Sequence, residues 1–266
     1  MSEPAHTWRR YVAIGDSVTE GLVDPTPDGG LRGWADRFAQ HLADQAGEPV
    51  EYANLAIRGR QLRPIIAEQL EPALALKPDL VSLWGGGNDL LRARADVDAI
   101  TTQLEQAVIR LREAGADVIV GTGIDSKGSP LLEVTRPRTA IYNANIWSIA
   151  RRHGAFVIDV WGMRCLKDWQ LWYDDRLHFN SIGHERVSHA ALVAVGLEPR
   201  PGWDNPLPML PPKSRREWVD WQLTWAREHA GPWIGRRIRR TSSGAGRVPK
   251  LPDYVSVRPQ SPDPAE

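Results

Sequence analysis

Five short apolar runs alternate with helix-length segments along the first three quarters of this 266-residue chain. The runs are rich in β-branched residues and too short for helices, so they predict buried strands. We expect strands at Tyr11–Ile14, Val50–Leu55, Asp79–Trp84, Asp117–Gly121 and Ala155–Val160. We expect helices at Trp34–Ala46, Leu62–Leu76, Val97–Ala114, Arg138–His153 and Ser181–Val195. This alternation predicts an α/β fold, in which a parallel sheet of about five strands carries helices on both faces.

The composition is that of an ordinary globular protein, with 42% hydrophobic and 25% charged residues. The formal net charge is zero, so overall charge gives no reason to expect binding to nucleic acid or to a membrane. The two parts of the chain differ, however. From Arg200 onward there are 12 Lys/Arg against 7 Asp/Glu, whereas residues 1–199 carry 21 against 26. The C-terminal part is therefore basic and the rest mildly acidic.

Cysteine content and hydropathy both bear on the compartment. Cys165 is the only cysteine, so the fold needs no internal disulfide and no oxidising environment. Residues Met1–Arg10 lack the apolar stretch of a secretory signal, and no run approaches the roughly 20 apolar residues of a membrane span. We therefore predict a cytoplasmic protein.

Four short segments contain the residue types of a hydrolytic site. They are Gly15–Gly21, Asn54–Gly59, Gly85–Asp89 and Asp175–His178. The first three each follow a predicted strand. Open α/β sheets bind ligands at the carboxyl ends of their strands, so these segments are expected to meet at one edge of the sheet.

Ser17, His178 and Asp175 fit the division of labour in a Ser-His-Asp triad. A serine hydroxyl is a weak nucleophile at neutral pH, and His178 is the candidate base that would take its proton. Asp175 lies three residues before His178, so one short loop can supply both the base and the carboxylate that orients it. A surface ion pair is the alternative interpretation of Asp175 and His178 taken alone.

The four segments, in this order, resemble those of the SGNH hydrolases, also called the GDSL esterase/lipase family. The resemblance covers roughly residues 10–195 and implies a flavodoxin-like, three-layer α/β/α fold. It also implies a serine ester hydrolase that works through an acyl-enzyme and needs neither a cofactor nor a metal ion. By the same resemblance, the oxyanion is held by the N–H groups of Ser17 and Gly59 and by the side-chain amide of Asn88. The chain departs from the family pattern at Val18 and Ala56, and neither departure affects these residues.

The tryptophans Trp161, Trp169 and Trp172 precede the candidate base. They could form the wall of an apolar substrate pocket. Core packing is an equally good interpretation of the same residues.

The composition of the chain changes near Pro199, where a Pro-rich segment begins. This change suggests a hydrolase domain over residues 1–199 and an extension over residues 200–266. The extension comprises a Pro-rich connector, a Trp-rich amphipathic helix and a basic tail. Its helix is expected to begin with a capping box at Ser214 and to carry Trp218, Trp221 and Trp225 on one face. Such a stripe more often covers the parent domain or a second subunit, and the alternative is peripheral contact with a lipid surface.

Three functions agree with these residues. The first is hydrolysis of a small-molecule ester, with no nucleic-acid partner. The second is acyl transfer to an acceptor other than water, which the same residues would support. The third is a catalytically idle scaffold whose basic, Trp-rich extension binds a partner or anionic lipid. The natural ester is not predictable, because substrate specificity lies in loops that the motifs do not describe.

Overall fold

A six-stranded sheet of order β5-β4-β3-β1-β2-β6 forms the centre of the computed structural model. The structure describes residues 7–129, 132–211, 214–232, 235 and 243–260. The strands are β1 (Arg10–Gly15), β2 (Val50–Asn54), β3 (Leu80–Trp84), β4 (Asp117–Gly121), β5 (Phe156–Ile158) and β6 (Leu251–Val257). The first five are parallel to one another, as the alternation of strands and helices predicts, and β6 runs antiparallel to β2.

The helices expected from the sequence are all present. The main ones are α2 (Trp34–Ala46), α6 (Val97–Glu113), α7 (Arg136–His153), α8 (Ser181–Ala194) and the C-terminal α9 (Arg215–Trp225). The helix expected at residues 62–76 consists of α3 (Leu62–Ile65), the π-helical turn η1 (Ile66–Leu70) and α4 (Glu71–Ala75). The short elements are α1 (Ser17–Glu20), α5 (Gly87–Leu90), η2 (Glu133–Thr135), η3 (Arg164–Lys167), η4 (Trp169–Leu171) and η5 (Ala226–Ala230). The expected strands and the five helices of the core differ from the observed ones by at most two residues at either end.

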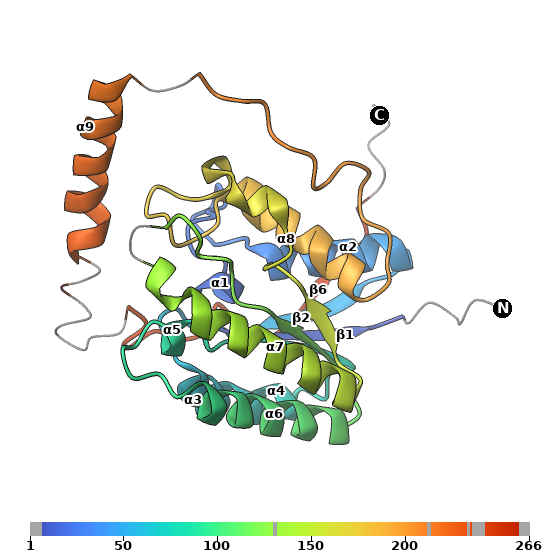
Figure 1. The fold of residues 1–266 in the computed structure, drawn as a ribbon. Coiled ribbons are helices and arrows are strands. Elements are labelled where there is room, and N and C mark those ends of the chain that lie inside the picture. The colour runs from blue at the N-terminus through green and yellow to red at the C-terminus, as the bar shows by residue number, and fades with distance from the viewer. Residues whose placement is uncertain (1–6, 130–131, 212–213, 233–234, 236–242, 261–266) are drawn as a thin grey trace.

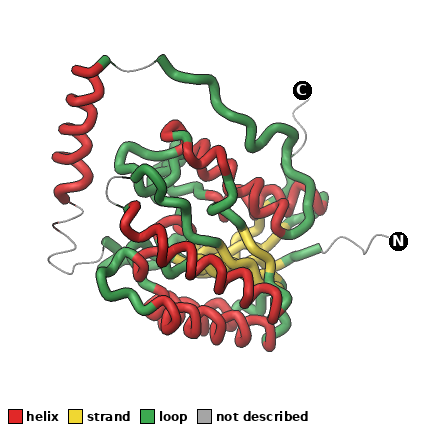
Figure 2. The backbone as a smooth tube through the Cα atoms, viewed as in Figure 1, coloured by secondary structure: helices red, strands yellow, loops and turns green. Residues whose placement is uncertain are grey.

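Helices cover both faces of the sheet, which confirms the three-layer architecture. Helices α2 and α8 lie on one face, and α3, α4, α6 and α7 lie on the other (Figure 1). The strands form the layer between them (Figure 2). Successive residues of β1 point to opposite faces, so Tyr11 and Ala13 join one hydrophobic cluster while Val12 and Ile14 join the other. Because both of its faces are buried, β1 is apolar from Tyr11 to Ile14 rather than alternating.

The strand order places a topological switch between β1 and β3. The five parallel strands follow the flavodoxin-like order 2-1-3-4-5, in which the chain leaves β1 toward β2 on one side and returns to β3 on the other. Ligands of such sheets bind at this switch, outside the carboxyl ends of the strands. Ser17 follows β1 directly and Asn88 follows β3, so the fold brings both candidates to the switch point.

Strand β6 adds a feature that sequence reasoning did not anticipate. The residues assigned to a basic, Pro-punctuated tail include a strand that pairs with β2, with Tyr52 opposite Val255. Just before it, the Lys250 ammonium donates to Asp36 Oδ2 at 2.6 Å and to the Leu31 carbonyl at 3.0 Å. The segment assigned to the extension therefore contributes one strand to the sheet of residues 1–199.

Helix α9 stands beside the layered core (Figure 1) and begins as the sequence indicates. The Ser214 hydroxyl accepts from the Glu217 N–H, and the Glu217 carboxylate accepts from the Ser214 N–H, which confirms the expected capping box. The basic run at residues 236–240 lies outside the described residues. No helix in the described part of the chain is long and apolar enough to cross a membrane.

Removal of β6 should weaken the sheet. A chain that ends after Gly246 loses the β2–β6 ladder and the Lys250–Asp36 ion pair. We expect its free energy of unfolding in urea to fall by about 2–4 kcal/mol, because each lost hydrogen bond contributes about 1 kcal/mol. Self-association in size-exclusion chromatography should increase, since β2 becomes an exposed edge. A chain ending after Gln260 keeps β6 and serves as the control, and equal stability of the two would contradict the structural role of β6.

Candidate active site

The candidate nucleophile lies in a tight turn between β1 and α1. Asp16 caps the short helix α1, and its Oδ1 accepts from the Val18 N–H at 3.1 Å. Ser17 is the first residue of that helix and is 8% exposed. A Cβ on Gly15 would lie 2.5 Å from the Trp84 carbonyl oxygen, so only glycine fits where β1 ends. The local sequence therefore determines where the Ser17 hydroxyl lies.

Gln69 holds the residue before this turn by both of its backbone groups. The Gly15 N–H donates to Gln69 Oε1 at 2.8 Å, and Gln69 Nε2 donates to the Gly15 carbonyl at 2.9 Å. Gln69 is fully buried in the π-helical turn η1, a kind of turn that is frequent at functional sites. The Gln69 amide thus forms the pair of hydrogen bonds that a neighbouring strand would otherwise form with Gly15.

The structure brings Ser17, His178 and Asp175 together in one hydrogen-bonded chain. Ser17 Oγ lies 2.9 Å from His178 Nε2, and His178 Nδ1 lies 2.6 Å from Asp175 Oδ2. With the Nδ1 proton donated to the carboxylate, Nε2 is left as an acceptor for the serine hydroxyl. The arrangement therefore has the geometry of a nucleophile, a base and a group that orients the base.

Asp175 is built to stay ionised beside the imidazole. Its Oδ1 accepts from the N–H groups of Leu177 and His178, at 2.9 and 3.0 Å. Burial acts to raise the pKa of Asp175, but the hydrogen bonds and the nearby imidazole outweigh it and hold that pKa below its usual value. A charged Asp175 keeps the Nδ1 proton on His178 and would stabilise the imidazolium that forms during catalysis.

The other two candidates for the oxyanion site lie in the loops after β2 and β3. Gly59 has a left-handed backbone, with φ of 72°, a conformation that favours glycine. Asn88 Nδ2 donates to the Arg60 carbonyl at 2.9 Å and to Asp16 Oδ2 at 3.0 Å. The Asn88 amide thus links the residue after Gly59 to the residue before Ser17.

Buried polar side chains brace the loop that carries Gly59. Arg58 forms a two-nitrogen ion pair with Glu20, and its backbone N–H also donates to Glu20 Oε2 at 2.7 Å. Asn54, at the end of β2, donates to the Thr19 carbonyl at 2.8 Å and accepts from the Ala56 N–H at 3.1 Å. Both contacts tie the loop after β2 to helix α1, on which Ser17 lies.

Comparison with protein families gives a match that includes all four motif segments. A profile of the GDSL-like Lipase/Acylhydrolase family matches residues 13–186. The chain belongs to this family. As a GDSL-like acylhydrolase it is a carboxylic ester hydrolase, and the resemblance noted from its four motifs is confirmed. None of the curated protein sequences compared with it is similar enough to count as a match.

Solved structures of three enzymes share the fold of this GDSL-like protein. The acetylxylan esterase Axe2 from Geobacillus stearothermophilus and LAE5, an alpha/beta hydrolase enzyme from the metagenome of Lake Arreo, are each 23% identical with a TM-score of 0.60. Each alignment covers 71% of this chain and 95% of the other. The psychrotrophic esterase EstA from Pseudoalteromonas sp. is 17% identical with a TM-score of 0.56, over 71% of this chain and 97% of its own. At these identities the likeness concerns the fold.

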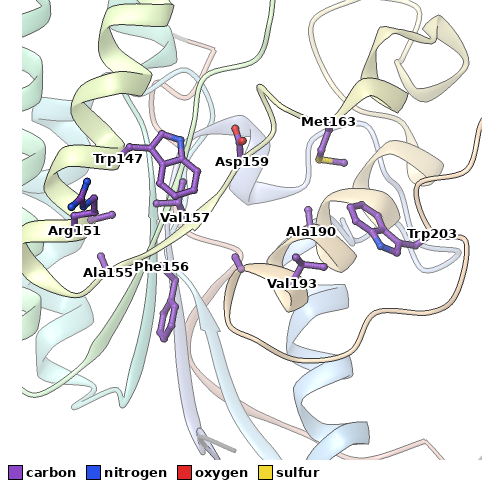
Figure 3. A pocket seen from close by; sticks show the side chains of 12 residues that line it. Trp147, Arg151, Ala155, Phe156, Val157, Asp159, Met163, Ala190, Val193 and Trp203 are labelled. Carbon is purple, nitrogen blue, oxygen red and sulfur yellow. The ribbon is translucent and has the colours of Figure 1, made fainter.

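One described cavity of the GDSL-like fold has none of the triad residues in its lining. It measures about 460 Å³ and lies beside the edge strand β5, between α7 and α8 (Figure 3). Trp147, Phe156, Val193 and Trp203 line it, and none of the triad residues does. Within the described ranges, no group of three His, Cys, Asp or Glu side chains could hold a metal ion.

The three tryptophans before the base do not line that cavity. Trp172 packs against Phe179 with ring centroids 4.8 Å apart, and its indole N–H donates to the Leu166 carbonyl. Trp169 is 41% exposed, and Trp161 lies under the Arg136 guanidinium at 5.3 Å. Core packing thus accounts for Trp172, while Trp169 is open to solvent.

Sequence reasoning missed several residues that support the site. Glu20 and Arg58 lie inside two of the four motifs, so an opposite-charge pair between motifs was a usable signal. Gln69 lies in a helix with no motif around it, and nothing local marks its contact with Gly15. Arg176, between Asp175 and His178, contacts the C-terminal helix, and only the tertiary structure reveals this.

Asp16 should make the stability of the protein depend on pH. Burial raises the pKa of Asp16 to about 6, so between about pH 4 and 6 the folded chain holds a proton that the unfolded chain releases. The free energy of unfolding therefore decreases as pH rises through this window. Asp16→Asn has no carboxyl group to titrate, so its free energy of unfolding does not decrease in this way. We expect the difference between the variant and the wild type in this free energy to rise by about 2–3 kcal/mol between pH 4 and 6.5, measured by urea unfolding.

The matched control is Asp28→Asn. Asp28 is exposed, and a hydrogen bond from Thr26 lowers its pKa rather than raising it. Its stability relative to wild type should show no rise over the same window. A flat pH dependence for Asp16→Asn would contradict the raised pKa of Asp16.

Proposed function

We propose that this protein is a serine ester hydrolase in which Ser17 is the nucleophile, His178 the general base and Asp175 the group that orients the base. The hydrogen-bonded chain from Ser17 Oγ through His178 to Asp175, with links of 2.9 and 2.6 Å, carries the proposal. Both distances lie within the range needed for proton transfer. The substrate is a small-molecule ester, and no cofactor takes part.

The reaction proceeds in two halves. Ser17 Oγ attacks the ester carbonyl carbon while its proton passes to His178 Nε2. The tetrahedral intermediate then expels the alcohol, which takes that proton and leaves an acyl-enzyme on Ser17. Water attacks the acyl-enzyme in the same way, with His178 again the base, and releases the carboxylic acid.

The oxyanion of each intermediate is held by the N–H groups of Ser17 and Gly59 and by the Asn88 amide. In the resting protein that amide donates to the Asp16 carboxylate and to the Arg60 carbonyl. We propose that the substrate oxygen replaces Asp16 as an acceptor when the intermediate forms. The remaining bond to the Arg60 carbonyl keeps the amide in place, and donors held in place before reaction stabilise the developing charge.

A fold relative supports this assignment of roles. Solved variants described as catalytic mutants of the esterase Axe2 replace a serine, an aspartate and a histidine by alanine. Its aspartate and histidine are three positions apart, as Asp175 and His178 are here. The likeness of fold makes the same two roles reasonable for this pair.

Ser17→Ala should abolish the activity. We expect kcat/KM for a short-chain p-nitrophenyl ester to fall about 10⁴-fold or more, because the nucleophile is lost. Labelling by a fluorophosphonate should also disappear. Ser148→Ala is the control, since Ser148 is exposed on α7 and donates only to the Ala144 carbonyl. Undiminished hydrolysis by Ser17→Ala would remove Ser17 as the nucleophile, and an unlabelled wild-type protein would favour an idle scaffold.

Asn88→Ala should lower kcat more than it raises KM. The loss of one oxyanion donor reduces kcat by about 10²–10³-fold in comparable enzymes, because the bond strengthens in the transition state. The matched control is Asn145→Ala, which removes an amide on α7 that donates to Thr101 Oγ1. Steady-state kinetics on the same ester measure both constants. A change in KM alone would assign Asn88 to substrate binding instead.

A further inference from the structure

Helix α9 of the C-terminal extension contacts the turn that carries the candidate base. The Trp225 indole N–H donates to the carbonyl of Asp175 at 3.3 Å. The next residue, Arg176, places its guanidinium carbon 3.7 Å from the ring centroid of Trp221 and 4.3 Å from that of Trp225. Arg176 Nη1 also donates to Gln222 Oε1 at 2.9 Å. One side chain of the catalytic turn is thus held between two indole rings of α9.

The position of Arg176 depends on those two rings. The residue is only 6% exposed, and its Nε and Nη2 atoms are buried without a hydrogen-bond partner in the described part of the protein. A guanidinium that is buried in this way loses its hydration, and other contacts must compensate for that loss. Stacking on an indole face provides such a contact, and the attraction between a cation and an aromatic ring is strongest when water is excluded. Trp221 and Trp225, together with the Gln222 side chain, therefore stabilise Arg176 where it lies.

The backbone at Arg176 couples this contact to the triad. Its φ is 58°, a left-handed conformation that is uncommon for residues other than glycine, asparagine and aspartate. Such a conformation persists only where the surroundings hold it. The N–H groups of Leu177 and His178 both donate to Asp175 Oδ1 across this residue. A shift of the Arg176 backbone would therefore move the carboxylate relative to the imidazole.

A second described part of the extension contacts another loop of the candidate site. Gly244 lies against the loop after β2, where an added Cβ would be 2.1 Å from the Arg58 carbonyl oxygen. Arg58 directly precedes the candidate oxyanion donor Gly59. Strand β6 then follows and pairs with β2, the strand from which this loop emerges. The extension is thus in contact with both the base loop and the oxyanion loop.

We propose that α9 positions the triad, with Arg176 clamped between Trp221 and Trp225 so that Asp175 and His178 keep their alignment with Ser17. This inference rests on the proposed ester hydrolase function. It makes Arg176, Trp221 and Trp225 positioning residues, since they act through Asp175 rather than on the substrate. The C-terminal extension is then part of the catalytic unit.

Helix α9 itself provides the matched control. Trp218 belongs to the same sequence stripe, but it is 51% exposed, whereas Trp221 and Trp225 are half-buried. Trp218→Leu removes an indole of the same size from the same helix without touching Arg176. If the stripe served mainly as a lipid-binding face, Trp218 would matter as much as the other two.

Steady-state kinetics test the proposal with Trp221→Leu, Trp225→Leu and the double variant. The concentration of active sites is fixed by complete titration with a fluorophosphonate, so loss of folded protein does not count as loss of kcat. We expect kcat for a short-chain p-nitrophenyl ester to fall about 10–100-fold in the double variant, because small misplacements of catalytic groups have effects of this size. KM should stay within about twofold, and Trp218→Leu should match wild type.

Two conservative variants separate stacking from other roles. Trp221→Phe keeps an aromatic face over the guanidinium and should retain kcat within about threefold of wild type. Arg176→Lys keeps the positive charge but lacks the planar group that stacks between the rings, so it should behave like the double leucine variant. A wild-type kcat in Arg176→Lys would contradict the proposal that stacking of Arg176 on Trp221 and Trp225 positions the triad.

A spectroscopic measurement tests the alignment without turnover. The His178 Nδ1 proton shared with Asp175 should give a far-downfield proton NMR signal, assigned by its loss in His178→Ala. We expect the signal to weaken or vanish in the double leucine variant and to persist in Trp218→Leu. An unchanged signal, or an unchanged kcat, in the double variant would overturn the proposal. Absence of Ser17-dependent hydrolysis in the wild type would instead refute the proposed function, and the NMR comparison would still decide whether α9 aligns the pair.

Discussion

Backbone hydrogen bonds between β1 and the chain beside it determine where the active-site loops lie. The ladder between β1 and β2 continues past the end of β2, with Leu55 N–H donating to Ala13 and Ile57 N–H donating to Gly15, at 2.9 and 3.2 Å. The loop that carries Gly59 is therefore tied by main-chain bonds to the strand that delivers Ser17. On the other side, β3 runs parallel to β1 along its whole length. Because parallel strands end at the same edge, the polar loops converge there.

Buried polar side chains hold that edge in one arrangement. Gln69 satisfies both backbone groups of Gly15, and the Glu20–Arg58 pair joins helix α1 to the loop after β2. Each of these groups would be unfavourable if it were buried without its partner, so alternative arrangements of the loops are penalised. The same reasoning extends to Arg176, whose buried guanidinium is compensated by two indole rings of α9. Ser17 and His178 thus lie on short segments whose polar neighbours are held by hydrogen bonds or by ring contacts.

Most of the core could be predicted from the sequence because its signals are local. Strand β3, for example, is a short buried run that is apolar apart from Ser82. Helix α6 is amphipathic, and the side chain of Asp96 caps its N-terminus. Strand β6 could not be predicted in the same way. It contains Pro252 and three exposed or half-exposed polar positions, and such a segment becomes a strand only because β2 offers it an unpaired edge. Gln69 was missed for a similar reason, since its partner lies 54 residues away.

Local signals in the sequence are enough to predict the layered fold and the candidate residues that meet at the carboxyl ends of the strands. Periodicity, capping and short motifs act over a few residues, so they can be recognised without coordinates. The folded chain is needed to see which groups support Ser17 and His178, that α9 contacts Asp175 and that β6 pairs with β2. Local patterns do not reveal these contacts, because they pair a buried amide, an edge strand or a guanidinium with partners distant in sequence. These contacts are strong because water is excluded around them, and that environment forms only when the chain folds.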